Sequence, residues 1–233
     1  MRIAIFSDIH GNKEALKAVI DDIKNEKIDE IICLGDTIGI GPNPKECMDM
    51  IISNNINMVL GNHELYFLKG TDIDPLLGED EIKHQNWVKE QITDEQKEFL
   101  EKCNLSLEKE IKDKKILFEH FLIDSNSNNE YPFYSLNIIK ENMINGIVDK
   151  MNYDLIFIGH EHKEFNLDNK LYDGGSSGCR KDNITRYTIL DTDSFEIYTK
   201  NIPFDRVKFE EALLRENYPD RDLIAKWFFG IEL

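Results

Sequence analysis

The chain has 233 residues, of which 41% are hydrophobic and 31% charged, a balance typical of a large soluble globular domain. Its 28 basic and 45 acidic residues give a net charge of −17, which argues against a long nucleic acid as partner, because such binding needs Lys and Arg at the phosphates. No apolar run approaches the ~18 residues of a membrane span, and the first residues read directly as a strand, so we expect a cytoplasmic protein with no membrane partner.

The first sixty residues alternate between strand and helix patterns. Short apolar runs predict buried strands at 2–7, 30–34 and 57–60. Between them, residues 13–25 carry apolar side chains at helical spacing, and a second helix begins at Pro44 behind Asn43 as N-cap. This βαβαβ order predicts a parallel sheet, whose ligand sites lie beyond the carboxyl ends of its strands.

The middle of the chain is more charged. Residues 64–112 are mostly helical in pattern, with a capping box at 93–96, and we interpret them as a helical insertion beside the site. His84 lies in this segment without an acidic or glycine partner, so we interpret it as a surface residue of a helix. Further strands are predicted at 115–118 and 155–158, separated by a polar loop at 124–131 and a helix at about 135–151.

After residue 170 the hydrophobic period changes to two. This predicts antiparallel strands at 170–174, 185–191 and 194–200, followed by a helical segment at 205–229. We expect the aromatic residues near its end to lie in the core, although an interface between copies is open: Trp227, Phe228 and Phe229. No linker interrupts the pattern, so we expect one domain over residues 1–233.

The four cysteines show no metal-binding spacing. Cys33 falls in an apolar strand and Cys47 in a helix, so both are expected to be reduced packing residues. Cys179 lies in a polar, glycine-rich loop, which makes it the one thiol whose surroundings could be functional.

Clusters of His, Asp and Asn follow the predicted strands. They are Asp8-Ile9-His10, Gly35-Asp36, Gly61-Asn62-His63-Glu64 and Gly159-His160-Glu161-His162, with His120 alone after another strand. Ligands delivered from several strand ends can converge on one point, and a carboxylate can bridge two cations, so Asp36 is a sensible central ligand. We therefore predict a site for two metal ions, which indicates phosphoester chemistry.

Single members of these clusters have other uses. An Asp after a strand or an Asn after Gly is commonly a turn residue. The assignment of Asp36 and Asn62 as ligands therefore rests on the other candidate ligands in the sequence. His63 can be a ligand or a general acid. Because adjacent residues rarely reach the same metal, His63 is freer to act on substrate if Asn62 binds.

The motif order resembles that of the calcineurin-like metallophosphoesterases over residues 5 to about 200. Three further stretches resemble the small bacterial phosphodiesterase branch: Gly41-Pro42-Asn43-Pro44, Gly174-Gly175-Ser176-Ser177-Gly178 and Ile202-Pro203-Phe204-Asp205. The resemblance implies an α/β (α+β) fold, a four-layer αββα sandwich in which two mixed β-sheets are flanked by helices. It implies that His63 protonates the leaving group. It also implies two metal sites that share Asp36, one with Asp8, His10 and His162 and the other with Asn62, His120 and His160.

The implied activity is a dinuclear-metal-dependent phosphoesterase that hydrolyses small phosphodiesters or phosphomonoesters, nucleotides among them, by a metal-bridging hydroxide. The mixture of imidazole, carboxylate and amide suits Mn best, with Fe, Ni, Co or Zn also compatible. Hydrolysis of dinucleoside polyphosphates, dephosphorylation of phosphoproteins and a catalytically silent interaction scaffold are the alternatives, and the complete ligand set favours an enzyme. Whether the chain forms a homo-oligomer is open.

Two positions depart from the resemblance. Phe121 follows His120 where the family commonly has Gly, and this bulk is expected either to narrow the site or to redirect the next loop. Arg180-Lys181 replaces the usual Pro-Arg, which leaves open whether either side chain contacts substrate.

Overall fold

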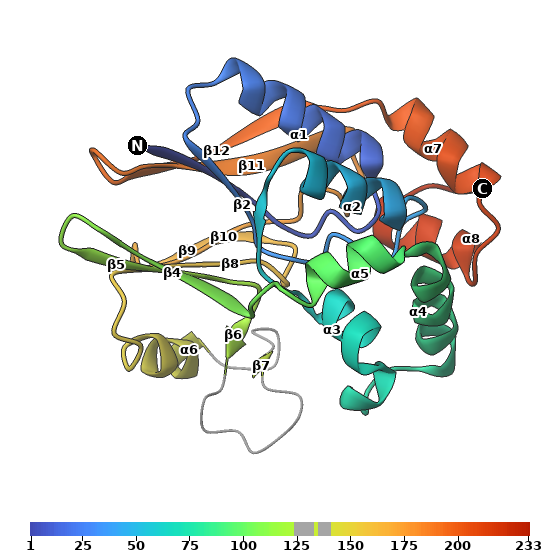
Figure 1. Ribbon diagram of the computed structural model, residues 1–233, viewed down its shortest axis with the longest axis horizontal. Coiled ribbons are helices and arrows are strands. Elements are labelled where there is room, and N and C mark those ends of the chain that lie inside the picture. The colour runs from blue at the N-terminus through green and yellow to red at the C-terminus, as the bar shows by residue number, and fades with distance from the viewer. Residues whose placement is uncertain (124–132, 135–140) are drawn as a thin grey trace.

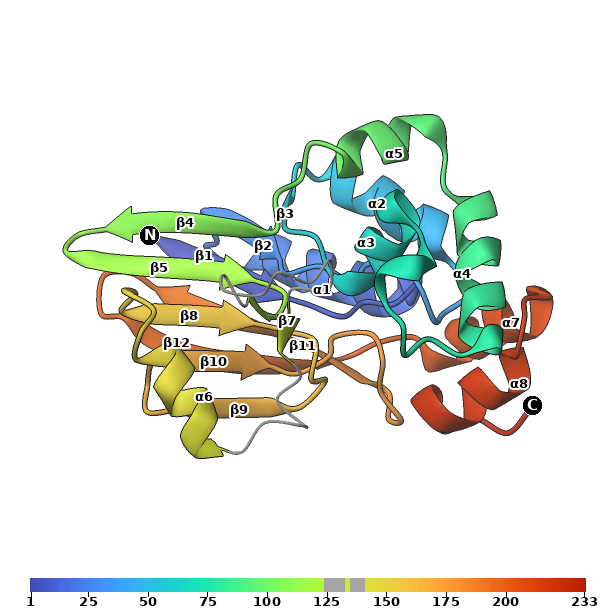
Figure 2. The same ribbon diagram turned by 90° about the horizontal axis from the view of Figure 1, so that it is seen from below.

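Two five-stranded sheets packed face to face form the centre of the computed structural model, which describes residues 1–123, 133–134 and 141–233 (Figures 1 and 2). The first sheet has the order β12 (Glu196–Pro203), β11 (Ile184–Asp191), β1 (Arg2–Phe6), β2 (Glu30–Cys33), β3 (Asn57–Met58). The second has the order β4 (Ser106–Ile111), β5 (Lys114–Glu119), β8 (Leu155–Ile158), β10 (Leu171–Gly174), β9 (Glu164–Leu167).

Both sheets are mixed, with a parallel centre and antiparallel edges. The strands β1, β2 and β3 are parallel, as are β5, β8 and β10, while β11, β12, β4 and β9 run antiparallel to their neighbours. The parallel strands are the near-continuous apolar runs of the sequence, because both of their faces are covered. Their carboxyl ends therefore point to one end of the molecule.

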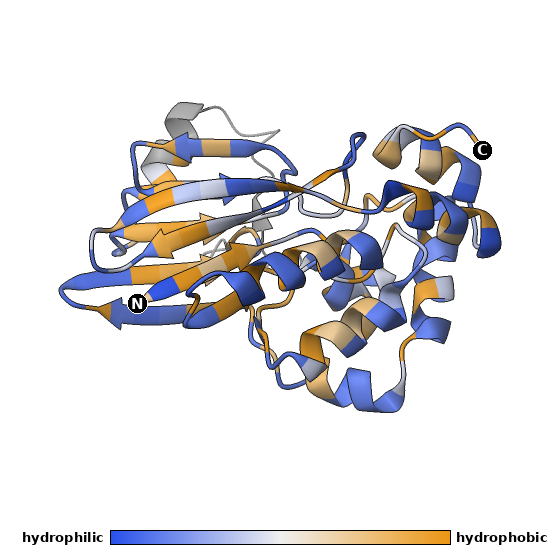
Figure 3. Ribbon diagram, turned by 90° about the horizontal axis from the view of Figure 1, so that it is seen from above, coloured by the Kyte–Doolittle hydropathy of each residue, from blue (hydrophilic) through white to orange (hydrophobic). Residues whose placement is uncertain are grey.

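Three apolar layers hold the sandwich together. Ile3, Ile5, Phe118 and Phe157 belong to the core between the two sheets. Helices α1 (Lys13–Asn25) and α2 (Pro44–Ser53) bury their apolar faces against the outer side of the first sheet. On the outer side of the second sheet, α6 (Glu141–Val148) contributes Val148. Figure 3 shows this distribution, with hydrophobic residues along the strands and hydrophilic residues on the outer parts of the helices. The predicted four-layer αββα sandwich is confirmed.

The remaining helices gather at the end of the sandwich to which the parallel strands point (Figure 2). They are α3 (Asn62–Lys69), a 3₁₀ turn (Thr71–Ile73), α4 (Glu79–Gln91) and α5 (Asp94–Leu100) from the middle of the chain. From its last part come α7 (Arg206–Arg215), α8 (Arg221–Ile224) and a π-helical turn (Ala225–Phe229). The capping box at Thr93 is present, with Thr93 accepting from the Gln96 N–H. No helix in the described parts of the chain is both long and apolar enough to cross a membrane.

Several sequence expectations need correction. The helical prediction for 64–112 is wrong at its end, because Ser106–Ile111 alternates and pairs with β5 as an edge strand. Strand β9 was missed because four residues with two partly buried side chains carry too little pattern. The helix expected at about 135–151 is described only as Glu141–Val148, and the predicted loop 124–131 lies outside the described residues.

At the end of the chain, the expectation of an aromatic core holds for one residue of three. Phe229 is buried against Phe209, whereas Trp227 and Phe228 are 67% and 40% exposed. The reason is the break between α7 and α8, which the continuous helical prediction did not anticipate. Two short strands, β6 (Leu122–Ile123) and β7 (Phe133–Tyr134), form a separate two-stranded antiparallel sheet.

Candidate metal centre

All seven predicted ligands and His63 come together at the carboxyl ends of β1, β2, β5 and β8 and at the start of α3. Five of the seven have left-handed backbone, with φ between 48° and 73°: Asp8, His10, Asp36, His160 and His162. This conformation is uncommon for residues with a side chain and costs of order 1–3 kcal/mol each. Its concentration at the predicted ligands indicates that the loops are held in these conformations for a functional reason.

The first group of ligand atoms surrounds Asp8. The Nε2 atoms of His10 and His162 lie 2.9 Å apart. Asp8 Oδ1 lies 3.7 Å from the first of these nitrogens and 3.4 Å from the second. Two imidazole nitrogens and a carboxylate oxygen facing one point can hold a cation.

The second group is built around His120 and His160. Asp36 Oδ2 lies 3.1 Å from His120 Nε2 and also 3.8 Å from His10 Nε2, so this carboxylate faces both groups. Asn62 Oδ1 lies 3.0 Å from His160 Nδ1, which brings the amide to the same place. Asp36, His120 and His160 therefore form a second group of converging ligand atoms.

The chemistry of the donor set fits bound cations. His120 Nδ1 donates to the Leu34 carbonyl at 2.8 Å, so in the neutral ring Nε2 is the nitrogen whose lone pair is free for a cation. Asp8 and Asp36 are almost completely buried, and neither pairs with a Lys or Arg of the described chain. Burial opposes their charge, yet the surrounding imidazoles lower the pKa of both carboxyls. Burial by itself would lower the pKa of His120, but the nearby Asp36 carboxylate outweighs burial and raises this pKa to about 9. Two buried carboxylates that draw positive charge onto imidazoles are suited to divalent cations.

Glu64 fixes the two loops that carry Asp36 and Asn62. Its carboxylate is fully buried and accepts backbone N–H bonds from Asp36, Thr37, Ile38 and Gly61 at 2.8–3.2 Å. Sequence reasoning assigned Glu64 no role, although a Glu at the third helical position was a signal for bonding back to the N-cap. The backbone at residue 61 approaches Asp36 so closely that glycine is required, because a Cβ on Gly61 would lie 2.2 Å from Asp36 Oδ1.

The glycine-rich loop after β10 braces the Asp8 loop. The Ser176 hydroxyl donates to the Asp8 carbonyl at 2.8 Å, and the Gly178 N–H donates to the same carbonyl at 3.0 Å. Asn12, the N-cap of α1, donates from its side chain to the Gly178 carbonyl at 2.8 Å. Cys179 is buried beside His162, and the expected packing of Cys33 and Cys47 is confirmed by their complete burial. The loop thus positions ligands rather than carrying them.

His63 is the second residue of α3, directly after Asn62, and faces His10, with ring centroids 4.9 Å apart. Its backbone N–H donates to Asp36 Oδ1 at 2.9 Å, and its Nδ1 lies 2.8 Å from Gln85 Nε2 of α4. If the amide nitrogen is the donor, the proton of the neutral ring resides on Nε2. Burial lowers the pKa of His63 to about 3, so the ring is neutral at pH 7. Gln85 was missed because nothing in its local sequence marks it.

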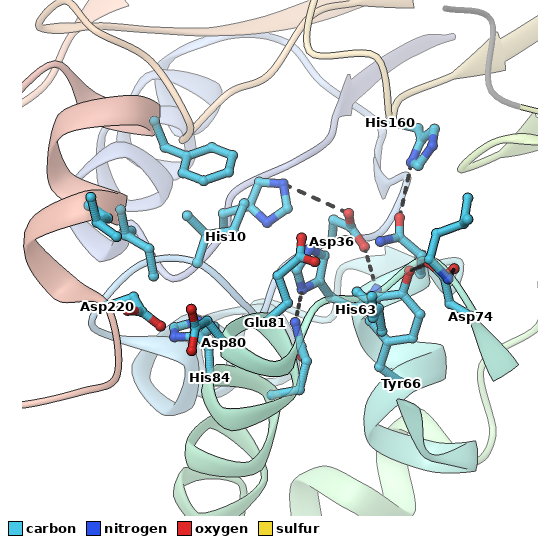
Figure 4. Close-up of a pocket in the computed structure, with 18 of the residues that line it drawn as sticks. His10, Asp36, His63, Tyr66, Asp74, Asp80, Glu81, His84, His160 and Asp220 are labelled. Atoms are coloured by element: carbon cyan, nitrogen blue, oxygen red, sulfur yellow. Dashed lines mark hydrogen bonds and ion pairs between the residues drawn. The ribbon is translucent and has the colours of Figure 1, made fainter. Parts of the chain in front are cut away.

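A pocket opens from the ligands toward α4 and α8 (Figure 4). It has a volume of about 460 Å³ and is lined by ligand residues together with side chains from the loop after the 3₁₀ turn, α4, α8 and the π-helical turn. The expectation that His84 is a surface residue is wrong, since it is 4% exposed and lines this pocket. The error arose because the residues that bury His84 include Tyr218, which is remote in sequence.

The two departures noted in the sequence lie outside this pocket. Phe121 is buried and packs edge-on against the rings of His120 and His160, behind the ligands. Arg180 forms an ion pair with Asp182 at 2.6 Å, and Lys181 lies against Gly230. None of Phe121, Arg180 and Lys181 is among the residues that line the pocket.

This fold and ligand arrangement define a metallophosphoesterase-type centre, and comparison with known proteins agrees. The calcineurin-like phosphoesterase family matches residues 1–164, and the chain belongs to this family. Members are phosphoester hydrolases that in general depend on metal ions.

Three known proteins illustrate what the chain is similar to. It is 34% identical to an uncharacterized protein of Methanocaldococcus jannaschii over 94% of each chain. A metallophosphoesterase from Sphaerobacter thermophilus, 22% identical, shares the fold with a TM-score of 0.74 over 99% of each chain. A symmetrical bis(5'-nucleosyl)-tetraphosphatase of Erwinia tasmaniensis is 31% identical over 71 residues, which are 29% of this chain and 26% of that protein.

Proposed function

We propose that the chain is a dinuclear-metal-dependent phosphoesterase that hydrolyses small phosphodiesters or phosphomonoesters. The observation that carries the proposal is the convergence of two groups of ligand atoms that both lie close to the Asp36 carboxylate. Asp8, His10 and His162 would hold one cation with Asp36, and Asn62, His120 and His160 the other. When bound, the two cations supply a water-derived nucleophile at neutral pH and stabilise charge on the phosphoryl oxygens.

His63 is the proposed proton donor to the leaving oxygen. It lines the pocket beside the ligands, and Gln85 holds its Nδ1 so that Nε2 is the nitrogen available to a substrate. A phosphoryl anion beside the ring favours its protonated form. Gln85 can accommodate both forms, because turning its amide presents either the NH₂ donor or the carbonyl acceptor to Nδ1.

The proposal is tested with bis-p-nitrophenyl phosphate and p-nitrophenyl phosphate. The chain is stripped with chelator and then assayed with Mn, Fe, Co, Ni or Zn added singly. We expect no turnover after chelation and the highest turnover with Mn, in keeping with the ligand types. Asp36→Asn should be inactive, whereas Asp113→Asn, an exposed change of equal charge, should behave as the parent chain. Full activity in the presence of excess chelator would contradict the proposal.

A second candidate is hydrolysis of dinucleoside polyphosphates, which the short match to the symmetrical tetraphosphatase favours. The measurement is the release of nucleotides from diadenosine tetraphosphate under the same metal conditions. Turnover that exceeds that of the simple diesters would favour this candidate over the first.

A further inference from the structure

Beyond the candidate metal ligands, the charged side chains that line the pocket in the described structure are all acidic. Besides Asp36 of the metal centre, four carboxylates reach it: Asp74 after the 3₁₀ turn, Asp80 and Glu81 at the start of α4, and Asp220 before α8 (Figure 4). No Lys or Arg in the described part of the chain lines it. The excess of acid in the pocket is therefore not balanced by basic side chains on its walls.

Two of the four carboxylates are already engaged. Asp74 accepts hydrogen bonds from the Tyr66 hydroxyl at 2.7 Å and from the Leu76 N–H at 2.9 Å. Asp80 pairs with Lys83, which lies outside the pocket lining, at 2.8 Å.

The other two carboxylates, Glu81 and Asp220, make no ion pair within the described residues. Among the residues that the structure describes, Glu81 accepts a hydrogen bond from the Gly78 N–H alone, and the Asp220 side chain forms no capping bond. Lys83 interacts electrostatically with Asp220 from a distance, but its ion pair is with Asp80. No basic side chain of the described residues forms an ion pair with the Glu81 or Asp220 carboxylate, so both can attract a cationic ligand.

A second observation also indicates a ligand in this pocket. His84 lines it with 4% of its surface exposed, and neither ring nitrogen has a hydrogen bond of standard geometry in the described structure. The backbone of Pro219 lies close enough to the ring to favour its protonated form, although burial outweighs this effect. A buried imidazole with unused hydrogen-bonding capacity is costly unless something polar enters the pocket.

The rest of the lining is apolar and aromatic. It includes the ring of Tyr66, the side chains Leu77, Leu223 and Ile224, and Phe228, which is 40% exposed at the rim. Aromatic faces combined with carboxylates are the surroundings in which organic ammonium groups bind. Metal ions, in contrast, would need oxygen ligands that converge more closely.

We propose that this pocket binds an ester group of the substrate that is compact, partly apolar and positively charged, such as the choline or amino-alcohol group of a phosphodiester. The inference rests on the proposed function, because the phosphoryl group of this substrate would lie at the ligands of the metal centre. It also separates the two candidate functions. The additional phosphates of a dinucleoside polyphosphate would lie against Glu81 and Asp220, where like charges repel.

The test compares two substrates of the same shape. In p-nitrophenyl phosphocholine the ester group carries a quaternary nitrogen, and in p-nitrophenyl 3,3-dimethylbutyl phosphate a carbon replaces that nitrogen. With Mn added to the full chain, we expect kcat/KM to favour the cationic substrate about tenfold. A ratio of one or below would overturn the inference.

Substitutions of the pocket carboxylates test whether they cause the preference for the cationic substrate. Glu81→Gln and Asp220→Asn should each lower the ratio about threefold, because each removes one unpaired carboxylate. Glu98→Gln and Asp113→Asn make the same chemical changes at exposed positions outside the pocket and should leave the ratio as in the parent. A ratio that is insensitive to both pocket variants would also contradict the inference.

Two further arms complete the design. Glycerophosphocholine in solution and phosphatidylcholine in vesicles distinguish a free diester from a lipid headgroup as the source of the cationic group, and turnover of either supports the class. If no substrate is hydrolysed, the proposed function fails. Calorimetric binding of phosphocholine against 3,3-dimethylbutyl phosphate still decides the inference, and equal affinities would overturn it.

Discussion

Replacing Glu64 by Gln tests whether one buried carboxylate holds two ligand loops in place. Glu64 accepts four backbone N–H bonds, two at each oxygen. In Glu64→Gln one oxygen becomes an NH₂ group, which faces two N–H donors and leaves them unsatisfied. At roughly 1–2 kcal/mol for each lost bond, we expect a destabilisation of about 3 kcal/mol. For a chain of this size that corresponds to a fall in Tm of about 6–12 °C.

The assay is thermal unfolding followed by circular dichroism, with chelator present so that bound metal does not contribute. Burial raises the pKa of Glu64 to about 7, so the comparison is made at about pH 8.5, where the parent side chain is ionised. Glu98→Gln on the exposed face of α5 is the matched control and should keep the parental Tm. A Tm for Glu64→Gln within about 2 °C of the parent value would refute the bracing role.

Three further predictions concern His63, Gln85 and His84. His63→Asn should keep its metal and lose turnover of alkyl esters by ~10²–10⁴, measured by metal analysis and kinetics; loss of metal would make His63 a ligand instead. Gln85→Leu should slow alkyl esters more than p-nitrophenyl esters, because nitrophenolate leaves without a proton; equal slowing would contradict the positioning of His63. Burial lowers the pKa of His84 to about 4, so stability is lost as pH falls from about 6.5 toward 4. In urea unfolding, His84→Phe should therefore lose about 2 kcal/mol less than the parent between pH 7 and 5, and an identical loss would count against this account.

The buried strands were predictable because their sequence signals are local and strong, whereas the four-layer sandwich was implied by the family resemblance. The apolar runs Arg2–Phe6 and Leu155–Ile158 can be satisfied only as strands covered on both faces. Asp8 follows β1 in the first sheet and His160 follows β8 in the second, and the packing of the two sheets brings them to the same end of the sandwich, although 152 residues separate them. Their proximity follows from topology, so the clusters could be recognised from order and spacing alone.

Side chains that act through tertiary contacts could not be recognised in this way. Gln85 lies near His63 only because α4 packs beside α3, and no local pattern encodes that approach. His84 has the polar, charged neighbours of a surface helix, yet Tyr218 and Trp87 bury it. The acidic residues that line the pocket could likewise not be distinguished in the sequence from the rest of the 45 acidic residues, most of which are expected at the solvated surface.

The central claim is that two divalent cations share Asp36, and metal content measures it most directly. The parent chain, loaded with Mn and freed of excess metal, should contain two equivalents per chain by elemental analysis. Asp36→Asn should lose most of both, since its carboxylate faces both groups of ligands, while Asp113→Asn should retain two. A parent chain that binds one equivalent or none, or an Asp36→Asn variant that keeps two, would contradict the account.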